Sequence, residues 1–140
     1  MSEGAIDLEI VTPERKILSV ENAKDVEIPG IDGYFGVLPG HAPLLTRLGV
    51  GEMSYTDDTG RHYLAAADGL VEVLPHRVTI LAQICEPARE IDVERARAAK
   101  ARAEASIKDV AKMTDQQMLQ IEVSLKKAIT RLHVAGRIRT

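Results

Sequence analysis

The sequence predicts an α+β protein in which an N-terminal antiparallel β-sandwich is followed by a C-terminal antiparallel two-helix hairpin. Residues 6–82 contain several short segments of alternating apolar and polar residues, separated by Gly, Pro and Asp. From residue 92 onward, apolar residues recur at the three-four spacing of amphipathic helices. All six prolines and nine of the ten glycines precede residue 89. We therefore predict a sandwich over residues 1–87 and a hairpin over residues 88–140.

The strand predictions follow from this alternation and from the turn residues between the segments. Residues 6–11 alternate regularly, and Pro13 closes that strand. Asp-Gly pairs predict turns at residues 32–33 and 68–69, and residues 57–60 predict a hairpin turn. Short strands at this spacing indicate an antiparallel sandwich or barrel rather than a parallel sheet with crossover helices. The further predicted strands cover residues 17–20, 23–28, 34–38, 44–50, 49–56, 61–65, 70–74 and 77–82.

Two stripes of apolar residues predict the helices of the hairpin. The connection at residues 113–115 is short, so the helices should be antiparallel neighbours, with Thr114 or Asp115 capping the second. Alanine buries little apolar area, so the pairing should be weak. Gly136 should end the second helix, which leaves Arg137 and Arg139 on a short tail. The first stripe contains Ala96, Ala99, Ala103, Ser106, Val110 and Met113, and the second contains Met118, Ile121, Leu125, Ala128, Leu132 and Ala135.

Composition excludes several classes of protein. Aromatic residues make up 3% of the chain, which argues against base stacking with nucleic acid. Cys85 is the single cysteine, so neither an internal disulfide nor a cysteine-built metal site is expected. No apolar run approaches the roughly 18 residues that a membrane span needs, so any membrane association should be peripheral. Residues 1–88 carry a charge of −8 and residues 89–140 carry +5, for a total of −3.

The sequence contains no convincing catalytic or metal site. Residues 58–60 read Asp-Thr-Gly, as in aspartic proteases, but no second triplet exists and we interpret them as an exposed turn. His41 and Cys85 lack the context of a catalytic pair, and the four histidines lack the spacing of zinc ligands. No glycine-rich phosphate loop precedes a helix. We therefore predict a protein that is not an enzyme.

The most informative motif is Phe-Gly-Val-Leu-Pro-Gly-His-Ala-Pro-Leu at residues 35–44, which follows Pro29-Gly30 and an Asp-Gly turn. It resembles the signature of the epsilon subunit of rotary proton-translocating ATP synthases. Residues 78–82, the Ile-Asp-x-x-Arg-Ala segment at 91–96 and the Ala-x-x-Arg-Leu-x-Val segment at 128–134 also resemble that family. Residues 68–70 depart from it, because they read Asp-Gly-Leu where the family commonly has a Gly-Gly-Phe-like turn.

This resemblance implies a non-catalytic subunit of the central stalk, peripheral to the cytoplasmic face of a bacterial plasma membrane. The sandwich would attach the gamma subunit to the ring of membrane c subunits. The helices would inhibit ATP hydrolysis by the alpha and beta subunits of the catalytic head. The residues expected to bind partners are Phe35, Val37, Leu38, His41, Leu44, Leu45 and Met53 on the sandwich, and Lys126, Lys127 and Arg131 on the hairpin.

The resemblance also implies a candidate site for ATP as a regulatory ligand, although no cofactor is required. Lys127 stands where the family has an arginine, and it lacks the planar fork that suits phosphate. The alternative, with equal weight, is that Asp92 only caps the first helix and Arg95 is a solvated neighbour. The positions that match the ATP-binding residues are Glu86, Ile91, Asp92, Arg95, Arg102 and Arg131.

Two further alternatives concern the basic C-terminal part. It could bind an acidic protein surface or nucleic acid; its charge of +5 and the acidic sandwich favour a protein. The whole chain could also be a free-standing β-sandwich protein-binding module with a helical dimerisation tail. Such a module would form a dimer when expressed alone, whereas a stalk subunit would be a monomer that copurifies with a membrane-bound ATPase.

Overall fold

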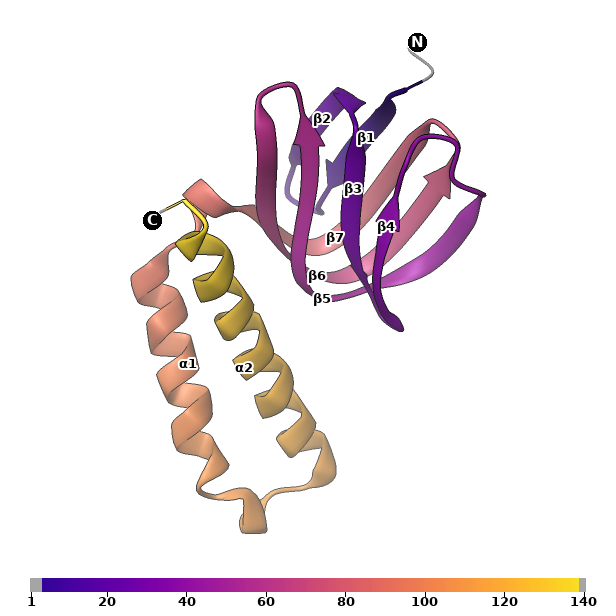
Figure 1. Ribbon diagram of the computed structural model, residues 1–140. Coiled ribbons are helices and arrows are strands. Elements are labelled where there is room, and N and C mark those ends of the chain that lie inside the picture. Colours follow the sequence, from indigo (N-terminus) through magenta and orange to yellow (C-terminus); the bar gives the residue numbers. More distant parts are fainter. Residues whose placement is uncertain (1–3, 139–140) are drawn as a thin grey trace.

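A computed structural model describes residues 4–138 and contains a seven-stranded sheet followed by two helices (Figure 1). The predicted fold class is thereby confirmed. The strands are β1 (Ile6–Val11), β2 (Lys16–Ala23), β3 (Asp25–Gly30), β4 (Gly33–Val37), β5 (Leu44–Asp57), β6 (Gly60–Leu74) and β7 (Arg77–Pro87). The helices are α1 (Val93–Ile107) and α2 (Asp115–Gly136), and the short 3₁₀ turns η1 (Ala88–Glu90) and η2 (Val110–Lys112) precede them.

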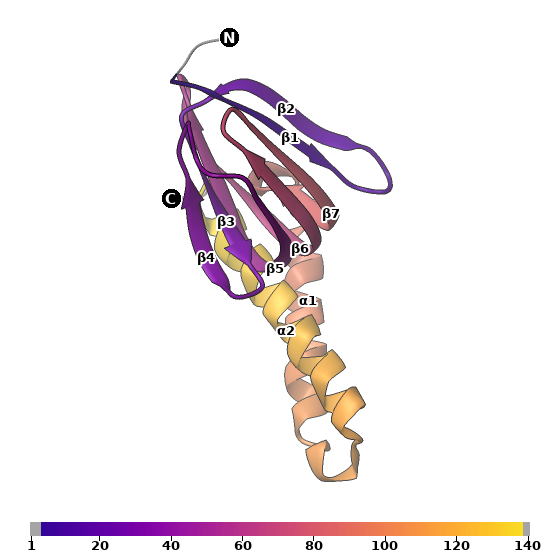
Figure 2. The same cartoon turned by 90° about the vertical axis from the view of Figure 1, so that its right-hand side faces the viewer.

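The strand order is β2-β1-β7-β6-β5-β3-β4. The sheet curls on itself, because β2 contacts β5 although the two strands are not neighbours in the sheet (Figures 1 and 2). All strand pairs are antiparallel except β1 with β7, which is parallel. The sequence analysis did not predict this parallel pair. The two strands are far apart in the chain and no tight turn joins them, so their relative direction is not restricted locally.

The sandwich core consists of aliphatic side chains from the inward-facing positions of the strands. Ile6, Leu8 and Ile10 in β1 are at most 1% exposed, and they alternate with half-exposed neighbours. Ile80 in β7 completes the same layer. Cys85 also lies in this core, where burial raises the pKa of its thiol to about 12. The thiol is therefore protonated and unreactive at neutral pH.

Strands β5 and β6 are longer than the sequence pattern predicted. Residues 44–57 form one strand, and residues 60–74 form another. The predicted turn at Asp68-Gly69 was therefore wrong, because β6 continues through these two residues. Both residues have positive φ, 59° for Asp68 and 142° for Gly69, yet the register with β5 and β7 is unbroken on both sides of them. An Asp-Gly pair accepts this conformation in a turn or in a strand held from both sides, so the local sequence could not distinguish the two.

The helix termini follow the predicted capping chemistry. The Asp92 side chain caps α1 by accepting a hydrogen bond from the Arg95 backbone amide at 3.0 Å. Thr114, rather than Asp115, caps α2 in a reciprocal capping box with Gln117. Helix α2 ends at Gly136 as predicted. Arg139 lies outside the described residues.

Helix α1 is shorter than its apolar stripe predicted. It ends at Ile107, so Val110 and Met113 belong to η2 and its boundary rather than to the helix. These residues lie near the tip of the hairpin, where the sandwich provides no packing (Figure 2). Without packing against the sandwich, the three-four pattern did not stabilise another turn of helix.

The hairpin packs on the sandwich through α2, which contacts β5 and β6, while α1 packs mainly on α2 (Figure 1). A second apolar cluster lies at this contact and is separate from the sandwich core. It contains Ala65, Ala88, Ile91, Val134 and Ala135, with Tyr63 and Val93 packed against it. Among the described residues, neither helix is both long and apolar enough to cross a membrane.

Candidate binding sites

The loop at residues 38–43 and the first two residues of β5 carry the exposed part of the predicted partner surface. Leu38 is 64% exposed and Leu45 is 71% exposed. Leu44 is also exposed, and His41 is half-buried with its Nδ1 atom 2.6 Å from the Ala42 carbonyl oxygen. The Gly40 amide donates a hydrogen bond to the Pro75 carbonyl at 2.7 Å, which holds the loop against the β6–β7 turn.

Three residues predicted for this surface are placed elsewhere. Val37 and Met53 are 1% and 0% exposed and belong to the sandwich core, and Phe35 is half-buried against it. The sequence analysis missed Leu70 and Leu74, which β6 presents to solvent. The sequence does contain a signal for them. Val71 and Val73 point inward, so the alternation of a strand predicts that Leu70 and Leu74 point outward.

The two helices enclose a groove of about 600 Å³. The alanine stripe of α1 creates this space, because its small side chains leave room opposite the larger side chains of α2. Arg102, Lys127 and Arg131, three of the residues matched to an ATP site, line the groove. Polar side chains of Ser106, Gln117 and Ser124 also line it. The groove can therefore accommodate an anion with several hydrogen-bond acceptors.

The other residues matched to an ATP site have different surroundings. Ile91 is 4% exposed in the cluster between hairpin and sandwich. Asp92 caps α1, and Arg95 is exposed beside it. Glu86 approaches the groove through its ion pair with Arg131, whose Nε atom lies 2.6 Å from Glu86 Oε1. The structure thus places Arg102, Lys127 and Arg131 around one groove, with Glu86 paired to Arg131, and leaves the 91–95 segment outside the groove lining.

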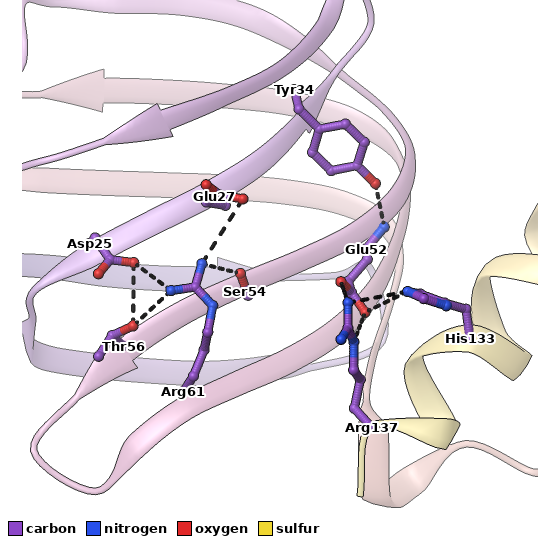
Figure 3. A network of polar contacts seen from close by, with 9 residues as sticks. All are labelled: Asp25, Glu27, Tyr34, Glu52, Ser54, Thr56, Arg61, His133 and Arg137. Atoms are coloured by element: carbon purple, nitrogen blue, oxygen red, sulfur yellow. Dashed lines mark hydrogen bonds and ion pairs between the residues drawn. The ribbon is translucent and has the colours of Figure 1, made fainter.

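Ion pairs join the hairpin to the sandwich, and we call three of them the docking pairs: Lys127–Asp68 and Arg131–Glu86 on α2, and Arg137–Glu52 directly after its last residue. Lys127 Nζ lies 3.4 Å from Asp68 Oδ2. Arg137 binds both carboxylate oxygens of Glu52 at 2.9 and 2.8 Å, which raises the pKa of its guanidinium (Figure 3). These contacts place the acidic sandwich against the basic hairpin.

Glu52 is the centre of the third docking pair. Its backbone amide donates to the Tyr34 hydroxyl at 2.9 Å, and His133 Nε2 lies 3.5 Å from its carboxylate (Figure 3). The Arg137 guanidinium also lies 4.7 Å from the ring centroid of Tyr63. The sequence analysis assigned Arg137 to a short tail after the second helix and named no partner residue for it. Its partner lies 85 residues earlier, and only the packing of α2 brings them together.

The remaining polar clusters of the sandwich belong to strand pairing. Arg61 bonds to Asp25, Ser54 and Thr56 across three neighbouring strands (Figure 3). Asp58 lies in the exposed β5–β6 turn and contacts Asn22 and Lys24 of the facing strand end. Among the described residues, no three His, Cys, Asp or Glu side chains gather where they could hold a metal ion.

A curled β-sandwich with an exposed apolar loop and a basic helical hairpin docked against its other side defines a two-part binding protein. Residues 5–88 match the family model of the ATP synthase delta/epsilon chain β-sandwich domain. Residues 89–136 match the model of the long α-helix domain of the same chains. The chain belongs to the ATP synthase delta/epsilon chain family.

Individual relatives agree with this family and with the resemblance read from the sequence. The chain is 43% identical to ATP synthase epsilon chain 2 of Syntrophotalea carbinolica over 132 residues, which cover 94% of each protein. It is 53% identical to the ATP synthase epsilon chain of Koribacter versatilis over 98 residues, which cover 70% of this chain and 68% of the relative. A chain in the cryo-EM structure of the Euglena gracilis mitochondrial ATP synthase OSCP/F1/c-ring has the same fold. Its TM-score is 0.79 at 24% identity, over 95% of this chain and 82% of that one.

Proposed function

We propose that this chain is the epsilon subunit of an ATP synthase central stalk and has no catalytic role of its own. The sandwich attaches the gamma subunit to the ring of c subunits, and the hairpin inhibits ATP hydrolysis by the alpha and beta subunits. The complex places the chain peripherally on the cytoplasmic face of a bacterial plasma membrane. The observation that carries this proposal is the family match over both parts of the chain, 5–88 and 89–136.

The separation of two surfaces supports this division of roles. The exposed leucines Leu38 and Leu45 lie on the sandwich, and the ion pairs of the docked hairpin go to Glu52, Asp68 and Glu86 rather than to residues 38–45. Partner binding at these leucines therefore does not require those ion pairs to break. The exposed Lys126 faces solvent on α2 and remains available to an acidic partner while the hairpin is docked.

The rival function, a module that dimerises through its helices, has less support. A dimer would need an unpaired apolar stripe on the hairpin. Ala96 and Ala103 of α1 and Val134 and Ala135 of α2 are instead buried by contacts within the chain. We therefore expect the chain alone to sediment as a monomer, and a stable dimer would favour the rival.

Leu45→Asp and His41→Glu should each weaken incorporation into the membrane-bound ATPase. A charge in the apolar centre of an interface costs about 2 kcal/mol or more, so we expect incorporation to fall at least about tenfold. Copurification of tagged chain with the ATPase measures this. Leu119→Asp makes the same change at an exposed leucine of α2 and should incorporate normally. Normal incorporation of both sandwich variants would show that this loop is not the interface.

We further infer that the hairpin groove binds ATP as a regulatory ligand, with Arg102, Lys127 and Arg131 contacting the phosphates. The groove volume, its three cations and its hydroxyl and amide groups support this inference. The capping role of Asp92 is compatible with this site, because Asp92 lies outside the groove lining. Binding should favour the docked hairpin, since the ligand would bridge both helices.

Calorimetry on the isolated chain tests this site. Arg102→Ala should weaken ATP binding about tenfold or more, because it removes a charge-assisted hydrogen bond. Lys127→Arg should strengthen binding by adding a planar donor pair. Arg97→Ala is the control, since Arg97 is exposed on α1 and pairs with Glu94 outside the groove. Absence of any heat at millimolar ATP would contradict the site and leave Asp92 as a cap alone.

A further inference from the structure

Asp68 has an unusual backbone conformation for its place in the fold. It is the one described residue other than glycine with positive φ, 59°, and it lies inside a continuous strand. Asp and Asn tolerate this conformation better than other non-glycine residues, because their short polar side chains suit it. Asp68 is exposed between the buried Ala67 and the half-buried Gly69, and its carboxylate contacts Lys127 of α2.

Two of the docking pairs use neighbouring positions of α2. Lys127 and Arg131 are four residues apart, so they project from the same face of the helix. The side chain of Lys127 is only 25% exposed and that of Arg131 is 28% exposed. Both also line the groove between the helices. The same two cations therefore face two possible anions, the sandwich carboxylates on one side and a ligand in the groove on the other.

The first docking pair joins a half-exposed carboxylate to a largely buried ammonium group. The Asp68 side chain is 51% exposed and the Lys127 side chain is 25% exposed, and the Lys127 Nζ atom lies 3.4 Å from Asp68 Oδ2. The carboxylate at position 68 therefore offsets the charge of the cation at position 127.

We propose that Asp68 holds the hairpin closed on the sandwich without a bound anion, and that it lowers the affinity of the groove for polyphosphate. The first part follows from the docking pair itself. The second part rests on the ATP site proposed above, since Asp68 competes with phosphate for Lys127 and repels it. Asp68 is thus a positioning residue. It determines how strongly docking of the hairpin on the sandwich depends on an anion bound in the groove.

Asp68→Asn tests the first part in the full chain. Asparagine tolerates positive φ equally well, so the substitution removes the charge without adding backbone strain. Pulsed dipolar EPR between spin labels on cysteines replacing the exposed Asp32 and Lys112 measures closure, and the buried Cys85 should not label. We expect the closed-to-open ratio to fall roughly two- to fivefold, as for one partly exposed ion pair. If the chain is wholly closed, the comparison is repeated in a Val134→Ala background, which weakens the apolar contact.

A double-mutant cycle separates the pair from general effects. Lys127→Met keeps the apolar stem and should lower closure as much as Asp68→Asn, while the double variant should lower it no further. Glu72→Gln removes one charge from an exposed position of the same strand that makes no ion pair among residues 4–138, and it should change nothing. Unchanged closure in Asp68→Asn, or additive effects in the double variant, would overturn the docking role.

Calorimetry with ATP tests the second part. Asp68→Asn should bind ATP several-fold more tightly than the unsubstituted chain, and Glu72→Gln should not. Equal affinities in Asp68→Asn and the unsubstituted chain would overturn the competition. No binding by any variant would overturn both the ATP site and the competition, while the EPR result would still decide the docking role by itself.

Discussion

Deleting residues 89–140 should leave a folded sandwich that enters the ATPase complex and should raise ATP hydrolysis. The sandwich core is built from the strands alone, and the hairpin contributes only to the separate cluster around Val134 and Ala135. No strand is lost. Loss of an inhibitory contact worth about 0.4 to 1.4 kcal/mol should raise hydrolysis by roughly two- to tenfold. Steady-state hydrolysis by the reconstituted complex measures the effect, normalised to the amount of incorporated chain.

Charge reversal of the hairpin provides the matched comparison. Lys126, Lys127 and Arg131 changed together to Glu should reproduce the truncation, and high salt should weaken inhibition because exposed ion pairs are screened. The structure separates the contributions, since Lys126 faces solvent whereas Lys127 and Arg131 face the sandwich. Lys126→Glu alone should therefore reduce inhibition without undocking the hairpin. Hydrolysis unchanged by both truncation and triple reversal would exclude the inhibitory role and leave the structural one.

Gly69→Ala should be among the most destabilising single substitutions in the chain. A Cβ at this position would lie 2.0 Å from the Leu81 carbonyl oxygen and 2.9 Å from Ala82 Cα, both of them backbone atoms of the paired strand β7. The φ of 142° is also strained for any residue with a side chain. We expect a loss of about 2–6 kcal/mol in the free energy of unfolding, from strain and overpacking together.

Urea unfolding followed by circular dichroism measures this loss. Gly36→Ala is the control, because a Cβ there meets no atom within 4 Å and the backbone lacks the positive φ. It should shift the unfolding free energy by less than about 1 kcal/mol. Equal midpoints for the two variants would show that β6 and β7 can separate around residue 69 at little cost.

Local sequence patterns were sufficient to predict most strand segments, the helical hairpin and the helix caps. Alternation predicted the strand segments, and the change of period together with the distribution of Gly and Pro predicted the hairpin. Asp92 and Thr114 cap their helices because a short polar side chain can accept a hydrogen bond from the unpaired backbone amide three residues later. The motif at residues 35–44 identified the family, since a long run of specific residues carries information without any knowledge of packing. For the candidate site, the resemblance selected Arg102, Lys127 and Arg131, and the structure places these three residues around one groove.

The tertiary structure alone decided the features that depend on partners distant in the chain. Neighbouring strands on both sides keep β6 continuous through Asp68-Gly69, and a parallel β1–β7 pair closes the sheet. The curl of the sheet buries Met53 that the sequence assigned to a surface. The docking pairs join residues between 45 and 85 positions apart, and no periodicity or local motif encodes such a distance. Side-chain burial and ion pairing at this contact depend on where α2 rests on β5 and β6, which is a property of the packed chain.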